Sequence, residues 1–215
     1  MLKITKVFIL LTLSVCINCS ALAIVKTDNV KITGQNMSNT SDITPIIKIT
    51  NLEQIGMVVP DLTKAMDDMW KNFGIGPWNV LIYTPDRLKE VRYYNKPSKS
   101  GGKIGLCQVG KVQFELIEPI GKDNIYYDFV NKYGNGIQHL GWYKVETEED
   151  FYVTVKKLEA AGFPCIWSGH SPRSRFAYFD TTKILNTILE VIWLDKKANV
   201  KPDYIYPSEK NGGNL

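Results

Sequence analysis

The stretch QIGMVVPDLTKAMDDMWKNFG, residues 54–74, is repeated in diverged form by HLGWYKVETEEDFYVTVKKLEAAG, residues 139–162. At an offset of 85 the aligned pairs are Gln54 with His139, Gly56 with Gly141, and Asp61 with Glu146. In each segment a strand-like run of apolar residues precedes a helix-like run. An internal repeat of this kind indicates two copies of one supersecondary unit. The alternative is an ordinary α+β sandwich in which the similarity is coincidental.

The periodicity of the two halves predicts the order βαβββ twice. In the first half, Pro60 and Asp61 begin a helix with one apolar stripe, and Gly74 ends it. Each half closes with an acidic residue inside an apolar strand, in FELIEP at residues 114–119 and ILEVIW at residues 188–193. We therefore expect an α+β fold in residues 48–195, with modules 48–119 and 136–195 forming a curved mixed sheet around a cleft.

The N-terminus has the pattern of a secretory signal peptide, with a basic start, the apolar run VFILLTLSV, and the small residues Ala21 and Ala23. Cleavage after Ala23 would remove residues 1–23 and place the protein in the periplasm or outside the cell. The apolar run is shorter than the roughly 20 residues of a transmembrane helix. A lipid-anchored cysteine is the other alternative, but neither Cys16 nor Cys19 follows the small residue that such a site requires.

Outside the predicted domain, the chain is polar. Residues 24–47 are rich in Asn, Ser and Thr and predict a linker, and residues 196–215 predict a loosely ordered tail. Loss of residues 1–23, which hold two lysines and no acids, lowers the formal net charge from +4 to +2. This charge is too small to indicate a nucleic acid or an acidic membrane as a partner. We expect a small-molecule partner and no stable membrane insertion, and homodimerisation is left open.

Cys107 and Cys165 are the two cysteines that remain after cleavage. Export would permit a disulfide between them. Both lie in apolar strand-like runs, which favours buried free thiols instead.

Four segments resemble the vicinal oxygen chelate superfamily, which includes glyoxalase I, methylmalonyl-CoA epimerase, bleomycin-resistance proteins and extradiol dioxygenases. In chain order they are LEQIGMVVPDL, VQFELIEP, GIQHLGWY and TILEVIW. The resemblance covers residues 50–195 and implies two modules that form a U-shaped cleft around one divalent metal ion. Carried over by position, the implied ligands are Gln54, Glu115, His139 and Glu190.

The chemistry of these four residues agrees with such a site. Strand alternation leaves a glycine two residues after Gln54 and two after His139, which makes room on the cleft face. A lone carboxylate at Glu190, among apolar residues, needs a partner. An oxygen-rich set with one imidazole suits Zn, Ni, Co or Mn. The alternatives are a hydrogen-bonded core histidine and carboxylates paired with lysine or arginine.

The order Gln, Glu, His, Glu is similar to that of glyoxalase I, which implies proton transfer next to a metal-bound carbonyl, with Glu190 as the base and Glu115 as the second candidate. In the epimerase a further glutamate precedes the third strand of the first module, but this chain has SGGKIGL there. Gln54 in place of a histidine argues against an extradiol dioxygenase. Export argues against glutathione or coenzyme A substrates. The other classes are a metal-free binding protein of the bleomycin-resistance type and an interaction protein with a degenerate site.

Five further residues attract attention. We expect His170 in a loop, and Arg173 and Arg175 beside it could reach an anionic substrate. Trp78 is expected to pack in the core, with a substrate shelf as the alternative. Asp61 is expected to cap a helix.

Overall fold

The computed structural model describes residues 44–142 and 145–208. The predicted signal peptide and most of the predicted linker lie outside the described residues. Within the described part of the chain, no helix is both long and apolar enough to cross a bilayer.

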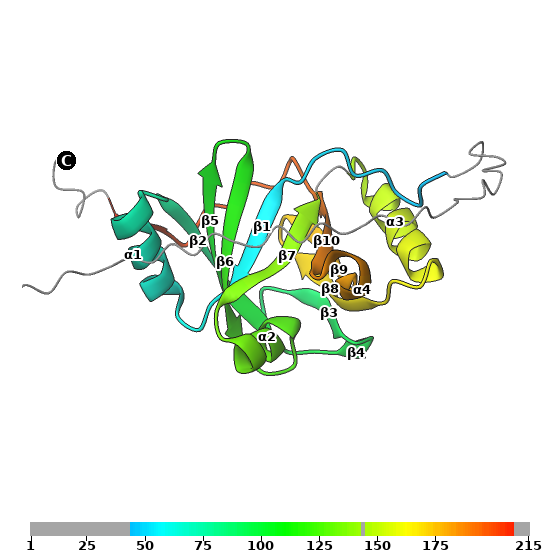
Figure 1. Cartoon of the computed structure of the whole chain (residues 1–215), viewed down its shortest axis with the longest axis horizontal. Coiled ribbons are helices and arrows are strands. Elements are labelled where there is room, and N and C mark those ends of the chain that lie inside the picture. The colour runs from blue at the N-terminus through cyan, green and yellow to red at the C-terminus, as the bar shows by residue number, and fades with distance from the viewer. Residues whose placement is uncertain (1–43, 143–144, 209–215) are drawn as a thin grey trace, which may run out of the picture. The chain divides into compact units, whose positions relative to one another are not determined.

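The described residues form one mixed sheet of eleven strands, with four helices against it (Figure 1). The strands are β1 (Gln54–Val58), β2 (Trp78–Tyr83), β3 (Lys89–Tyr93), β4 (Lys96–Pro97), β5 (Gly101–Val109), β6 (Val112–Ile120), β7 (Gly136–Trp142), β8 (Cys165–Ser171), β9 (Ser174–Phe179), β10 (Ile188–Leu194) and β11 (Tyr204–Tyr206). The helices are α1 (Leu62–Phe73), α2 (Ile125–Tyr133), α3 (Glu148–Ala160) and α4 (Thr182–Leu185). The strand order is β11-β2-β5-β6-β1-β7-β10-β9-β8-β3-β4.

The two-module prediction is confirmed by the strand pairing. In the first module β1 is parallel to β6, the last strand of that module, and in the second module β7 is parallel to β10. The modules meet where β1 and β7 pair antiparallel at the centre of the sheet. The strands that carry the four predicted ligands are therefore the four central neighbours β6, β1, β7 and β10.

The first helix begins and ends where the sequence predicts. The Asp61 carboxylate accepts a hydrogen bond from the Lys64 amide at 2.9 Å, which satisfies a free donor of the first turn. Gly74 ends α1 in the left-handed region, with φ of 66°. Leu62 and Met66 of this helix are buried. Figure 1 shows α1 and α3 flanking opposite ends of the sheet.

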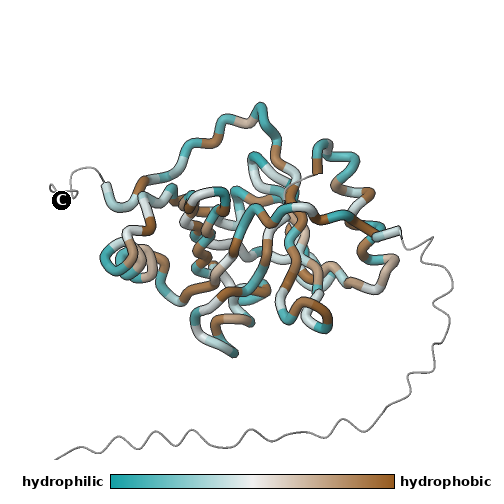
Figure 2. Tube along the Cα trace, turned by 45° about the horizontal axis from the view of Figure 1, so that its top comes forward, coloured by the Kyte–Doolittle hydropathy of each residue, from teal (hydrophilic) through white to brown (hydrophobic). Residues whose placement is uncertain are grey.

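The core lies between the sheet and these helices, and Figure 2 shows hydrophobic residues along much of the tube inside the domain. Trp78 is fully buried in the cluster with Leu62 and Met66, so its predicted packing role is confirmed. Cys107 and Cys165 are buried free thiols, also as predicted.

One hairpin departs from the simple repeat, because five strands follow α1 in the first module instead of three, and the two additional strands are β3 and β4. The chain leaves β2, crosses to the second module, and forms β3 beside β8 before it returns as β5. Tyr93 of β3 packs edge to face against Trp167 of β8 and donates a hydrogen bond to Asp128 at 2.6 Å. The extra hairpin of β3 and β4 therefore ties the first module to the far edge of the second.

Two sequence expectations are wrong. His170 lies in strand β8, paired with Arg175 of β9, and is not a loop residue. The expected loose tail contains β11, which pairs antiparallel with β2. The polar composition of the tail predicted a loose segment. Its order comes instead from the pairing of β11 at the edge of the sheet and from Asp203, which binds the Arg87 guanidinium at 2.8 Å.

Candidate metal centre and adjoining cavity

The register of the central strands brings the four predicted residues onto one face. Glu115, Gly56 and His139 are direct neighbours across β6, β1 and β7. In the adjacent row, Gln54 and Glu190 both stand opposite Gly141. Gly56 thus lies between Glu115 and His139, and Gly141 lies between Gln54 and Glu190.

Three of these side chains meet closely. His139 Nε2 lies 3.2 Å from Glu115 Oε2 and 3.4 Å from Glu190 Oε2, and all three residues are buried. Their ligand-type atoms lie within 4.8 Å of one another. One imidazole N–H can donate a good hydrogen bond to only one carboxylate. The approach of two carboxylates to a single nitrogen therefore favours a further cation between them.

Unsatisfied polar atoms at the same place support a bound cation. Gln54 Oε1 and Glu190 Oε2 are buried and lack hydrogen-bond partners among the described residues. For Glu190 Oε2, the 3.4 Å approach to His139 lies within ion-pair distance but outside hydrogen-bond geometry. The Gln54 amide is oriented by its Nε2, which donates to Gln113 Oε1 at 3.1 Å, and this leaves its oxygen free to act as a ligand. Buried oxygens without partners are costly, and a divalent cation would satisfy both.

The charged groups of the cluster shift the pKa values of His139 and Glu190. Burial lowers the pKa of His139, but its close contacts with Glu115 and Glu190 and the negative charges of these two residues outweigh burial and raise the pKa to about 9. Burial raises the pKa of Glu190, and His139 opposes that rise. Without a metal ion, the protein therefore neutralises part of the carboxylate charge with an imidazolium.

Gln138 holds the imidazole and was missed by sequence reasoning. Its Oε1 lies 2.7 Å from His139 Nδ1, so Nδ1–H can donate to it and leave Nε2 directed at the carboxylates. Strict alternation would turn Gln138 away from His139. The pairing of β1 with β7 shifts register here, from Gly56 opposite His139 to Met57 opposite Ile137, and the bulge leaves Gln138 unpaired in the ladder.

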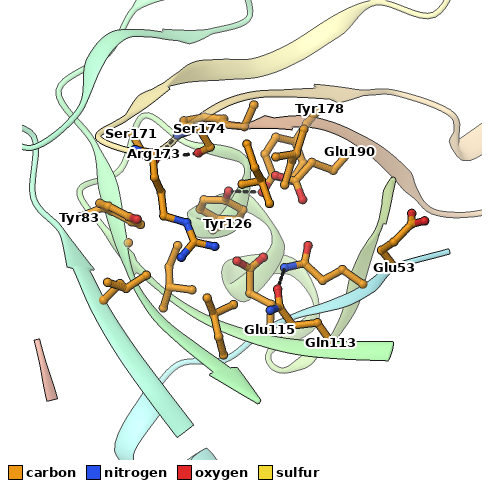
Figure 3. Close-up of a pocket in the computed structure, with 18 of the residues that line it drawn as sticks. Glu53, Tyr83, Gln113, Glu115, Tyr126, Ser171, Arg173, Ser174, Tyr178 and Glu190 are labelled. Atoms are coloured by element: carbon orange, nitrogen blue, oxygen red, sulfur yellow. Dashed lines mark hydrogen bonds between the residues drawn. The ribbon is translucent and has the colours of Figure 1, made fainter. Parts of the chain in front are cut away.

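The carboxylates open into a cavity of about 320 Å³ (Figure 3). Gln54, Glu115 and Glu190 line one part of it. Its apolar lining comes from both modules and consists of Leu81, Leu88, Ile104, Leu106, Trp167, Phe176, Ile192 and Leu194. A small molecule of mixed apolar and polar character fits such a lining.

Two tyrosines in the cavity wall add a polar pair beside Glu190. Tyr126 donates a hydrogen bond to the Tyr178 hydroxyl at 2.8 Å, and the Tyr178 ring packs edge to face against His139. Burial and the charge of Glu190 are the main causes that raise the pKa of both phenols well above the usual value, so both are neutral donors. Sequence reasoning missed this pair because α2 and β9 meet only in the folded protein.

The two arginines near His170 separate in the structure. Arg173 lines the cavity, whereas Arg175 donates from Nε to Glu148 Oε1 at 2.7 Å and stacks over Trp193. His170 is half-buried and contacts Tyr152 and Glu90 away from the cluster. Of these residues, only Arg173 faces the cavity.

The glycines of SGGKIGL explain why a second carboxylate is absent from this wall. Gly101 and Gly102 line the cavity at the start of β5. A Cβ on Gly101 would lie 1.9 Å from the carbonyl oxygen of Tyr83, so no larger side chain fits without moving the strand. In the described residues, the acids of the cavity are Glu53, Glu115 and Glu190.

The fold and the buried cluster place the protein in the glyoxalase-like class. The sequence profile of the Glyoxalase/Bleomycin resistance protein/Dioxygenase superfamily matches residues 53–179, and the chain belongs to this superfamily. The resemblance noted from the four sequence segments is thus confirmed.

Solved structures agree on the fold. Methylmalonyl-CoA epimerase from Mycobacterium tuberculosis is 19% identical with a TM-score of 0.51, and the match covers 68% of this chain and 89% of that one. A hypothetical protein from Bacillus halodurans is 17% identical with a TM-score of 0.50, covering 70% and 98%. A methylmalonyl-CoA epimerase solved with methylmalonyl-CoA and NH4+ is 13% identical with a TM-score of 0.51, covering 71% and 100%. No curated protein sequence matches the chain.

Proposed function

We propose that this protein is an exported enzyme that binds one divalent cation and moves a proton on the carbon next to a carbonyl group of a small molecule. The observation that carries the proposal is the buried cluster of Glu115, His139 and Glu190 at the cavity. Membership of the superfamily agrees with it. Export is supported by the sequence pattern of residues 1–23.

The cation would be held by Gln54, Glu115, His139 and Glu190. Two carboxylates balance its charge, and the unpartnered Gln54 Oε1 and the Nε2 of His139 complete four donors. Oxygen donors with one imidazole suit Zn, Ni, Co or Mn better than a closed structural zinc site. The chemistry that such an ion supplies when bound is Lewis-acid polarisation of a carbonyl oxygen.

The protein's own groups account for the proton transfer. Glu190 is the base that takes the proton from the α-carbon, because it lines the cavity and its buried setting favours a stronger base once its charge partners are displaced. The Tyr126–Tyr178 pair provides a neutral donor beside it. Glu115, on the opposite strand of the cluster, is the alternative base.

The wall around the substrate restricts the reaction type. A two-base epimerisation needs a second carboxylate on the opposite side, and a side chain at position 101 of β5 would collide with the carbonyl oxygen of Tyr83. A glyoxalase-like isomerase or lyase reaction needs one base that removes and returns the proton.

A second candidate function is small-molecule binding without metal or turnover. The cavity of about 320 Å³ with its largely apolar lining favours this candidate, because it would hold a ligand without the acidic cluster. In that case the imidazolium of His139 would neutralise part of the carboxylate charge.

Elemental analysis distinguishes the two. Protein starting at Ile24 is purified without chelators, and we expect close to one equivalent of divalent metal per chain. His139→Ala and Glu115→Ala should lose most of it. Glu118→Gln is the matched control, because Glu118 lies on the same strand as Glu115 but pairs with Lys103. Metal content unchanged in both cluster variants would contradict the proposal.

A further inference from the structure

We propose that Arg173 anchors a carboxylate of the substrate, so that the natural substrate is a monoanion with its chelating carbonyl group at one end and its carboxylate at the other. This inference rests on the proposed metal site and names the class of molecule that the site accepts.

The backbone around Arg173 is fixed. It lies in the turn between β8 and β9, where Ser171 Oγ accepts hydrogen bonds from the amides of Arg173 at 3.3 Å and Ser174 at 3.1 Å. The Arg173 carbonyl accepts from the Asp195 amide at 2.8 Å. From this turn the side chain extends into the cavity, as Figure 3 shows. The position of the charge therefore depends on the side-chain torsions of Arg173 and not on movement of the turn.

The guanidinium of Arg173 forms no ion pair with an acidic side chain in residues 44–142 and 145–208. None of the ion pairs among the described residues includes Arg173, although Glu115 and Glu190 line the same cavity. A half-buried arginine that faces apolar walls loses hydration without gaining an ion pair. An anionic ligand would supply the missing partner through the planar fork of the guanidinium.

Arg175 shows that the same hairpin can pair an arginine internally. It lies two residues further on, and its Nε donates to Glu148 Oε1 at 2.7 Å. Of the two arginines in this hairpin, the one that points into the cavity has no ion pair with a carboxylate of the described residues.

The charge balance selects a monoanion. The carboxylates of Glu115 and Glu190 would balance a divalent cation, and His139 would be neutral as a ligand. Arg173 then leaves one positive charge, since Glu53 and Lys111, which also line the cavity, have opposite signs. A carboxylate neutralises this charge, whereas a phosphate carries about −1.5 to −2 at neutral pH. The apolar side chains in the cavity wall fit an apolar spacer between the two ends.

The test uses hydroxamates, which chelate a divalent metal through two oxygens and need no turnover. A series of alkyl hydroxamates of increasing length carries a terminal carboxylate, a length-matched terminal amide, or a terminal phosphonate. Each is titrated into the zinc-loaded protein by calorimetry. For the best length, we expect the carboxylate to bind about tenfold tighter than the amide or more, as for a hydrogen bond to a charged group, and tighter than the phosphonate.

Variants assign the preference to Arg173. Arg173→Gln should bind carboxylate and amide equally, and Arg173→Lys should keep part of the preference because it keeps the charge without the fork. Arg175→Gln is the matched control and should bind like the wild type. Three outcomes would overturn this inference and leave the proposed metal site intact. The wild type could bind carboxylate and amide equally, it could bind the phosphonate more tightly than the carboxylate, or Arg173→Gln could keep the preference for the carboxylate. If no hydroxamate binds and zinc is not retained, the proposed metal site fails and the inference fails with it.

Discussion

Gly56 lies directly opposite His139 in the β1–β7 pairing, and a Cβ on Gly56 would lie 1.8 Å from Cε1 of the imidazole. The ring therefore occupies the space that a side chain at position 56 would fill. Sequence alternation predicted only that a glycine makes room on this face. The structure shows that the room is taken by the imidazole itself, which is fully buried.

Gly56→Ala should displace His139 and lower both metal content and stability. Overpacking of this kind costs typically about 1–3 kcal/mol, and we expect metal content to fall to less than half an equivalent, measured by elemental analysis and calorimetry. Gly136→Ala in β7 is the control, because its Cβ would meet only Phe129 at 3.4 Å. If the clash is the cause, adding His139→Ala to Gly56→Ala should restore part of the lost thermal stability. No recovery in the double variant would contradict this explanation.

The two thiols should resist modification in the native protein. Burial raises the pKa of Cys107, and raises that of Cys165 to about 11, so neither is a thiolate at pH 8. With protein that starts at Ile24, a colorimetric thiol reagent should react with neither cysteine in buffer and with both in denaturant. Failure to react even in denaturant would indicate a disulfide instead.

The edge strand β11 should contribute to stability through Asp203. Its carboxylate binds the Arg87 guanidinium and accepts a hydrogen bond from the Ile82 amide at 2.7 Å. We expect Asp203→Ala to cost about 1–2 kcal/mol, and Asp203→Asn less because it keeps an acceptor. The exposed Lys64–Asp68 pair on α1 is the control, and its loss should change stability much less, because both side chains are in solvent.

The Asp203 contribution should also depend on pH. The Ile82 amide and Arg87 lower the pKa of Asp203 in the folded state. The lowered pKa contributes its full stabilisation when the pH is above the unfolded-state pKa of about 3.9. This contribution disappears as the pH falls through the lower pKa of the folded state. The difference in melting temperature between wild type and Asp203→Ala should therefore shrink in acid. A constant difference across that range would assign the effect to packing.

The sequence predicted the residues that repeat a local pattern. Alternation and the 85-residue offset placed Gln54 and His139 on one face, and the acids in apolar strands pointed to Glu115 and Glu190. Gln138 was not predicted, because a bulge breaks the alternation on which the prediction relied. The crossing of β3 to β8 and the meeting of Tyr126 with Tyr178 depend on pairings between distant segments, which no local period encodes.

The exported protein should begin at Ile24. The motif of Ala21 and Ala23 predicts this cleavage position. Intact-mass measurement of periplasmic material should show the loss of residues 1–23. A diacylglyceryl adduct on Cys16 or Cys19 would contradict cleavage at this site and place the protein on a membrane.

The assignment of Glu190 as the base can be tested separately from its role as a ligand. Glu190→Gln keeps the size of the side chain and one oxygen donor but removes the base. Because the other three donors remain, the variant should retain most of its metal. Turnover should fall by about 10²–10⁴-fold, the range typical of general-base removal.

The measurement does not depend on knowing the natural substrate. Candidate α-hydroxycarbonyl compounds, with and without a terminal carboxylate, are incubated with zinc-loaded protein in D₂O, and deuterium at the α-carbon is followed by NMR. Glu118→Gln serves as the carboxylate control, because Glu118 bonds to the Leu62 amide and Lys103 outside the cluster. Exchange by Glu190→Gln at the wild-type rate would rule out Glu190 as the base. Glu115, 3.2 Å from the same imidazole nitrogen, would then be the carboxylate positioned to take the proton.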